Sequence, residues 1–207
     1  MNNLKNRLTK YAASAAAVTA AVAITGPVSS ANAAIVHSGI VNHTIDATIG
    51  GLYVNVATGA TGTSGSTTAG WDLNFWSSSG FGLFNPSAPS GGVYVVTSPG
   101  FGANMAQGAS IDGSNTYGSG TSSNTSQWNL NSDQNLVGFR FLNEGSGQVH
   151  YGWARIEFGS AVTSRTLVEY AWDDVAGTGI GAGVVPAPAA MALLGMGGLV
   201  AGRRRRA

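Results

Sequence analysis

Residues 135–158, NLVGFRFLNEGSGQVHYGWARIEF, carry the strongest fold signal in this sequence. Two runs, 135–142 and 148–158, alternate between large apolar and smaller or polar side chains. The segment 143–147 between them contains two glycines. Alternation with a period of two, interrupted by a short glycine-containing loop, is typical of a β-hairpin. The alternation predicts the following shared faces: Val137, Phe139 and Phe141 on the first strand, and Val149, Tyr151 and Trp153 on the second, with Gly152 leaving room on the opposite face.

The same pattern continues on both sides of the hairpin. Further strands are predicted at 35–36, 39–41, 44–49, 52–56, 71–76, 93–97 and 166–172. Segments rich in Gly, Ser, Thr and Asn separate them as loops, and 98–133 suggests only a short helix at 103–107. Roughly eight to ten short strands without a long amphipathic helix indicate an all-β domain, either an antiparallel β-sandwich or a jelly roll.

Composition limits the functions open to this domain. The chain has 207 residues, which favours one domain, and only 9% of them are charged. Between Ala34 and Val185, three arginines face nine acids, a net charge of −6. A surface of that sign repels nucleic acid, because phosphate binding requires basic side chains. There is no cysteine, so disulfides, thiolate metal sites and cysteine nucleophiles are excluded.

The N-terminal segment 1–33 has the three parts of a secretory signal peptide. Its basic start is followed by an apolar run at 11–24 and then by small residues. The residues that carry this prediction are Lys5, Arg7 and Lys10 at the start, and Ala31, Ala33 and Ala34 around the expected cleavage point. Signal peptidase is therefore an expected partner. The alternative is an uncleaved anchor, for which the run is short of the roughly 20 residues that span a bilayer.

The C-terminal segment 184–207 has a different design. It begins with the motif Val185, Pro186, Ala187, Pro188, continues without charge to Gly202, and ends with Arg203, Arg204, Arg205 and Arg206. An uncharged segment followed by a basic cluster predicts a transmembrane-like helix whose arginines stay in the cytoplasm. The expected organisation is thus a signal helix at 1–33, a glycine-rich β domain at 34–183 and a sorting tail at 184–207.

This order of Pro-x-Pro, apolar helix and terminal arginines resembles the PEP-CTERM sorting signal of bacterial exopolysaccharide-associated proteins. Ala187 occupies the position of the family's glutamate. The resemblance implies processing by an exosortase, a membrane-embedded cysteine protease that removes the tail. The segment 137–172 also resembles a region that recurs in exported proteins with such tails. This resemblance implies export from the cell but no activity. Retention in the membrane and release after cleavage both remain open.

Few residues predict chemistry. No Gly-x-Ser-x-Gly elbow is present, and Glu157 and Glu169 are expected on the solvent faces of neighbouring strands, opposite Arg155 or Arg165. Trp128, in the irregular region, is the candidate for stacking on a glycan. No cofactor is expected. Asp112, Asp173 and Asp174 are weak calcium candidates whose simpler role is in turns.

The sequence therefore predicts a non-catalytic exported protein of the cell surface or the extracellular matrix, sorted by its tail. The alternative is a module that binds the cell's own exopolysaccharide. A glycoside hydrolase is the third hypothesis, and it requires two carboxylates that face each other in a cleft.

Overall fold

The computed structural model describes residues 34–98, 100–122 and 125–185. The chain divides into two units, Met1–Ala31 and Asn32–Ala207, and all described residues belong to the second. This part of the chain is all-β with antiparallel strand pairs, and its helical content is one 3₁₀ turn, η1 (Thr125–Gln127). The predicted fold class is confirmed at this level.

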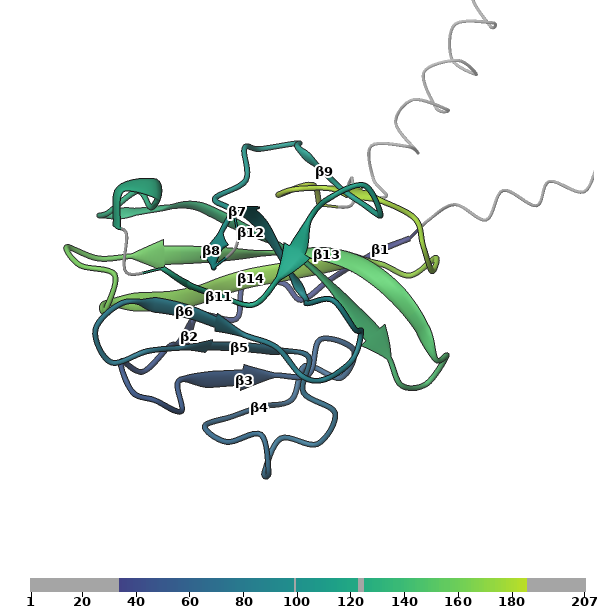
Figure 1. Ribbon diagram of the computed structural model, residues 1–207, viewed down its shortest axis with the longest axis horizontal. Helices are drawn as coiled ribbons and strands as arrows, with labels where there is room; N and C mark the ends of the chain where they lie inside the picture. The colour runs from purple at the N-terminus through teal and green to yellow at the C-terminus, as the bar shows by residue number, and fades with distance from the viewer. Residues whose placement is uncertain (1–33, 99, 123–124, 186–207) are drawn as a thin grey trace, which may run out of the picture. The chain divides into compact units, whose positions relative to one another are not determined.

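The larger sheet is built around the predicted hairpin (Figure 1). Its strand order is β1-β14-β13-β12-β7-β10, with β2 also paired to β14 and β8 to β7. The strands are β1 (Ile35–His37), β2 (His43–Thr44), β7 (Tyr94–Ser98), β8 (Phe101–Gly102), β10 (Tyr117–Gly118), β12 (Ser132–Asn143), β13 (Gln148–Phe158) and β14 (Arg165–Asp173).

The smaller sheet has the order β11-β6-β5-β3-β4 and forms a separate layer in Figure 1. Its strands are β3 (Leu52–Val54), β4 (Thr61–Gly62), β5 (Leu73–Trp76), β6 (Phe81–Phe84) and β11 (Gly120–Ser122). A further two-stranded ribbon pairs β9 (Ser110–Ile111) with β15 (Ile180–Gly181).

The predicted hairpin and its faces are confirmed, and the structure extends the first strand through Asn143, which pairs with Gln148. Phe139 lies opposite Gly152, and a Cβ at Gly152 would come within 2.5 Å of the Phe139 ring. The glycine is therefore required by the packing of the phenylalanine. The hairpin's turn is held by the Asn143 side chain, whose Oδ1 accepts a hydrogen bond from the Gly145 amide at 2.9 Å.

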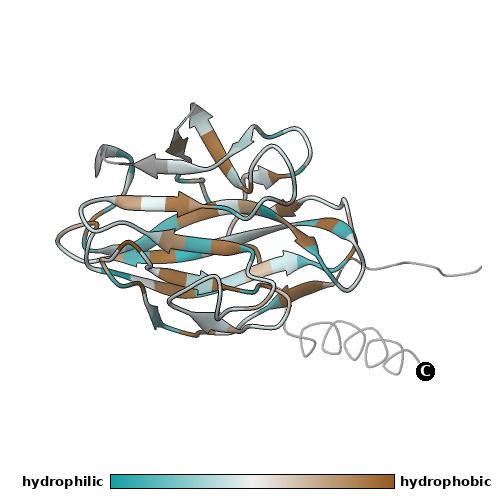
Figure 2. Ribbon diagram, turned by 60° about the horizontal axis from the view of Figure 1, so that its bottom comes forward, coloured by the Kyte–Doolittle hydropathy of each residue, from teal (hydrophilic) through white to brown (hydrophobic). Residues whose placement is uncertain are grey.

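One hydrophobic core is shared by the two sheets. Phe81 of the small sheet packs edge-to-face on Phe158 of the large sheet, with ring centroids 5.0 Å apart, and Phe75 lies 6.1 Å from Tyr94. These rings are fully buried or nearly so. Hydrophobic segments alternate with hydrophilic ones along the strands (Figure 2), as expected when one side of each strand faces this core.

Arg165 joins the two layers through the backbone. Its guanidinium is buried and donates hydrogen bonds to the carbonyls of Ser77, Gly80 and Asp46, and of Val162 at 3.3 Å. Burial lowers the pKa of Arg165 to about 10, so the side chain stays charged at neutral pH. Four carbonyl acceptors replace the water that this cation has lost.

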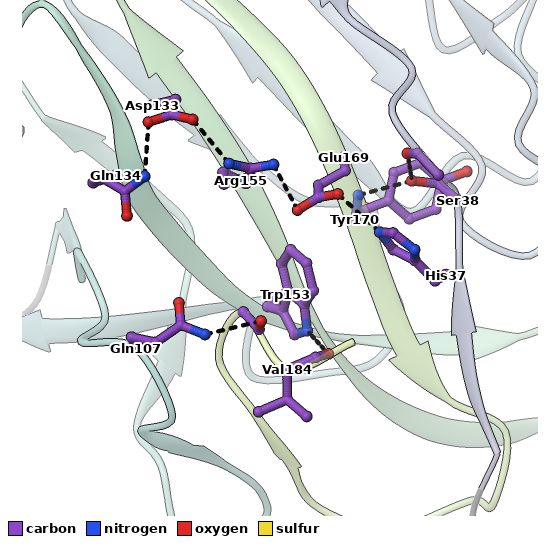
Figure 3. Close-up of polar contacts among 12 residues, drawn as sticks. His37, Ser38, Gln107, Asp133, Gln134, Trp153, Arg155, Glu169, Tyr170 and Val184 are labelled. Atoms are coloured by element: carbon purple, nitrogen blue, oxygen red, sulfur yellow. Dashed lines mark hydrogen bonds and ion pairs between the residues drawn. The ribbon is translucent and has the colours of Figure 1, made fainter. Parts of the chain in front are cut away.

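A second cluster covers the outer side of the large sheet, and Trp153 is at its centre. The indole Nε1 of Trp153 donates to the Val184 carbonyl at 3.0 Å, and the Gln107 amide donates to the Gly183 carbonyl at 2.9 Å (Figure 3). The segment that leads to the tail is thus fixed to the sheet as far as Val184.

Two strand predictions are wrong, and so is the predicted helix. Of the expected strand 44–49 only Thr44 lies in a strand, β2, and Ile49 is 79% exposed. The segment 39–41 is not a strand, because Gly39 has a φ of +68°. No helix forms at 103–107, where Ala103 and Met105 instead make backbone hydrogen bonds to β7 and β12.

Candidate functional site

The outer side of the small sheet carries four aromatic side chains, Tyr53, Trp71, Trp76 and Phe84, which we call the aromatic face. Alternation places three of them there, and Trp71, which precedes β5, joins them through its contacts with Tyr53 and Phe84. On β5, Leu73 and Phe75 are buried in the shared core, so Trp76 lies on the opposite side. Tyr53 of β3 and Phe84 of β6 follow the same rule, and all four rings are at least partly exposed.

The rings of this face contact one another. Trp71 stacks on Phe84 with centroids 5.9 Å apart and an interplanar angle of 21°, and it meets Tyr53 edge-on at 4.8 Å. Trp76 lies against Gly82 of the next strand, where a Cβ would come within 2.6 Å of its Nε1. A shallow hollow of about 230 Å³ lies among Ile49, Tyr53, Asn74, Trp76 and Phe84.

A second hollow, of about 350 Å³, opens at Trp71, and we call it the acidic pocket. Its charged residues are Asp72, which directly precedes β5, and Glu144, in the β12–β13 turn. Gly70 makes the arrangement possible: its φ is +61°, and a Cβ there would lie within 2.6 Å of both carboxylate oxygens of Glu144. The pocket is therefore formed by loops from both sheets.

Asp72 is 5% exposed and has one fixed carboxylate oxygen. Its Oδ2 accepts a hydrogen bond from the Val56 amide at 2.8 Å, whereas Oδ1 has no hydrogen-bond partner among the described residues. Burial raises the pKa of Asp72 from 3.8 to about 7; the Val56 N–H opposes this rise and the charge of Glu144 adds to it.

The described residues supply no cation to this pocket. Arg140 donates to the carbonyls of Ser90 and Gly92 and lies over Tyr117, with 4.4 Å from its Cζ to the ring centroid. The other two arginines of the described chain, Arg155 and Arg165, are bonded to other groups. The ion pairs formed within the described ranges leave out both Asp72 and Glu144.

A different charged group crosses the outer side of the large sheet (Figure 3). His37 contacts Glu169, Glu169 pairs with Arg155, and Arg155 pairs with Asp133, each at 2.9 Å. The predicted pairing of Arg155 with Glu169 is confirmed, but Glu169 is buried rather than on a solvent face. Each carboxylate in this group has a charged or hydrogen-bonding partner, and the four side chains come from β1, β14, β13 and β12. The group therefore links four neighbouring strands.

The prediction that Trp128 is exposed is wrong. Its side chain is 4% exposed and packs against Phe81 and Phe158 in the shared core. A ring enclosed in this way has no free face for a sugar. His150 is also buried, and its Nδ1 lies 2.8 Å from the Asp173 carbonyl.

The three calcium candidates do not come together. Asp112 accepts hydrogen bonds from Ser110 and Ser114, which lower its pKa to about 2. Asp173 accepts from the Val175 amide, and Asp174 accepts from the Ala34 amide at 2.8 Å. In the described part of the chain, no three His, Cys, Asp or Glu side chains are grouped so that they could hold a metal ion.

Most sorting residues lie outside the described residues: Ala31, Ala33, Pro186, Ala187, Pro188 and Arg203 to Arg206. Ala34 and Val185 are the first and last residues described. No helix within the described ranges is long and apolar enough to cross a membrane. Comparisons with protein-family models, with curated proteins and with solved structures found no match for this chain.

The aromatic face and the acidic pocket were not predicted from the sequence. For Trp76 and Asn74 a signal exists, because the alternation at 71–76 places them together on the side away from Phe75. For Asp72 and Glu144 there is no local signal, since only the packing of the two sheets brings these loops together.

Proposed function

We propose that this chain is a non-catalytic exported protein of the cell surface or extracellular matrix that binds polysaccharide through its aromatic face. The observation that supports the proposal is the group of partly exposed rings on one side of the small sheet. Aromatic faces stack on the apolar faces of sugar rings, and Trp and Tyr add polar edges for hydroxyl groups. We assign the two layers to the β-sandwich class, with a jelly-roll connection as the variant.

The exposure of apolar side chains on and beside the aromatic face is evidence for a binding role. Phe84 is 49% exposed and Ile49 is 79% exposed, in a domain that buries most of its other large apolar side chains. A cluster of exposed apolar side chains on one surface marks a contact with another molecule more often than isolated ones do. A polysaccharide also suits a domain whose net charge between Ala34 and Val185 is −6, because uncharged sugars are not repelled.

A glycan array probed with the full chain tests binding. Retention on one or more polysaccharides, weakened about tenfold or more by Trp76→Ala, is the expected result. The matched control is Ile40→Ala, which removes an apolar side chain that is 61% exposed outside the aromatic face. If the wild-type protein is retained on no polysaccharide, the binding function is wrong.

The export route is a separate part of the proposal. Cleavage by signal peptidase before Ala34 and processing of the Val185-Pro186-Ala187-Pro188 tail by an exosortase-type protease are supported by the sequence pattern. Fractionation of host cells with intact-mass measurement tests both steps. A mature chain that keeps Arg203 to Arg206 would contradict removal of the tail.

One observation favours a hydrolase as the second candidate. Asp72, with its pKa raised to about 7, and Glu144 line one pocket, and glycoside hydrolysis uses a pair of carboxyl groups of which one is the proton donor. The test is whether the protein releases new reducing ends from a bound polysaccharide. If it does, and Asp72→Asn abolishes this release, hydrolysis replaces binding as the proposed function.

A further inference from the structure

We propose that the acidic pocket binds the protonated amine of an amino sugar, within a polysaccharide chain that lies across the aromatic face. The inference rests on the proposed function, since it names the sugar class that the aromatic face would hold. It predicts selectivity for polysaccharides that contain free amines over neutral and acidic ones.

The pocket is continuous with the aromatic face through Trp71. The ring of Trp71 lines the pocket beside Asp72 and Glu144, and the same ring contacts Tyr53 and Phe84. A sugar on the aromatic face would therefore have its neighbour in the chain at the pocket. The volume of about 350 Å³ lies within the range of about 300–1,000 Å³ that is typical of small-molecule sites.

The charge of the pocket is unbalanced. Glu144 is exposed, whereas Asp72 is 5% exposed and has an unbonded Oδ1. Burying a carboxylate is costly unless a hydrogen bond or a cation compensates it. Since all three arginines of the described chain are bonded elsewhere, this cost is seen as the raised pKa of Asp72, and a cation from a ligand would offset it and favour the ionised carboxylate.

The surroundings favour an amine on a sugar ring over a metal ion. Calcium takes six to eight oxygen ligands, and the pocket's charged donors among the described residues are two carboxylates beside an indole. An ammonium group gains from both features, because it donates hydrogen bonds to carboxylates and is attracted to the face of a Trp ring. The sugar ring that carries the amine supplies the apolar face for stacking.

Calorimetric titration of the full chain tests the proposal with three oligosaccharides of equal length. These are a glucosamine oligomer, its N-acetylated counterpart and a glucose oligomer, at about pH 7, where Asp72, with its pKa of about 7, is half ionised even before a cation binds. We expect the glucosamine oligomer to bind most tightly. Glu144→Gln should weaken that complex about tenfold or more and leave the glucose oligomer unchanged.

Glu157→Gln is the matched control, because it removes an equal charge from an exposed residue of β13 outside the pocket. Equal losses in the two variants would overturn the proposal, since net charge alone would then explain the preference. Preference for the glucosamine oligomer only in the presence of calcium would also overturn it. If all three oligomers bind equally and Trp76→Ala weakens each complex, the amine site is rejected and the binding role of the aromatic face stands. A lack of binding to any oligomer would reject both.

Discussion

Replacing Asp72 by asparagine should stabilise the protein at alkaline pH and leave its stability unchanged in acid. The carboxyl group is buried, and its pKa is raised from 3.8 to about 7. The folded state therefore holds this proton more tightly than the unfolded state does. As a result, the contribution of Asp72 to the free energy of unfolding falls as the pH rises from about 4 to about 7, and it is constant beyond that range.

The size of the effect follows from the two pKa values. The interval from 3.8 to about 7, at about 1.4 kcal/mol for each pH unit, corresponds to about 4 kcal/mol. An asparagine is neutral, like the protonated carboxyl group, and keeps an oxygen that accepts from the Val56 amide, so it does not suffer this loss. We therefore expect Asp72→Asn to be about 4 kcal/mol more stable than the wild type at about pH 8.

Urea denaturation of both proteins between about pH 4 and pH 8 measures this difference. The other titratable groups near Asp72 are Glu144, Tyr94 and Tyr170. Burial raises the pKa of both tyrosines, so they stay neutral throughout the range. Glu144→Gln should make the fall in the free energy of unfolding only slightly smaller, because Glu144 is a minor cause of the raised pKa of Asp72. Parallel curves for the wild type and Asp72→Asn at all pH values would refute the reasoning.

Three further substitutions test other parts of the structure. Arg165→Met should lower the free energy of unfolding by about 3 kcal/mol in urea denaturation, because buried carbonyls lose their donor; an unchanged midpoint would contradict the bridging role. Gly152→Ala should cost about 1–3 kcal/mol, since its Cβ would meet the Phe139 ring, and a neutral effect would mean that the hairpin register is wrong. Asp174→Asn should lower the Tm of a chain that begins at Ala34 by about 2–4 °C, because the new ammonium group would face this carboxylate. The same substitution in the uncleaved chain should have a smaller effect, and equal shifts in differential scanning calorimetry would contradict that pairing.

The hairpin could be predicted because its signals are local. Alternation indicates which side of each strand is apolar, and the glycines of 143–147 place the turn, whereas the register that sets Gly152 opposite Phe139 comes from the structure. Alternation does not report a hydrogen-bonding partner, however. Ile45 is buried as the pattern requires and its amide donates to the Arg165 carbonyl at the start of β14, but the chain leaves β14 there, so the predicted strand 44–49 fails.

The candidate site depended on packing that the sequence does not display. Trp128 lies in an irregular segment and was expected at the surface, but the structure places it between Phe81 and Phe158. Asp72 and Glu144 belong to loops of different sheets, so their proximity follows only from the shared core. Irregular backbone is thus a poor guide to exposure in a domain with so little helix.

The most direct measurement of the central claim is the affinity of the full chain for exopolysaccharide purified from its own host, with wild type and Trp76→Ala side by side. We expect saturable binding by the wild type and binding weakened about tenfold or more in the variant, with unchanged circular dichroism. Equal binding by both proteins, or no binding by the wild type, would contradict a polysaccharide-binding role for the aromatic face.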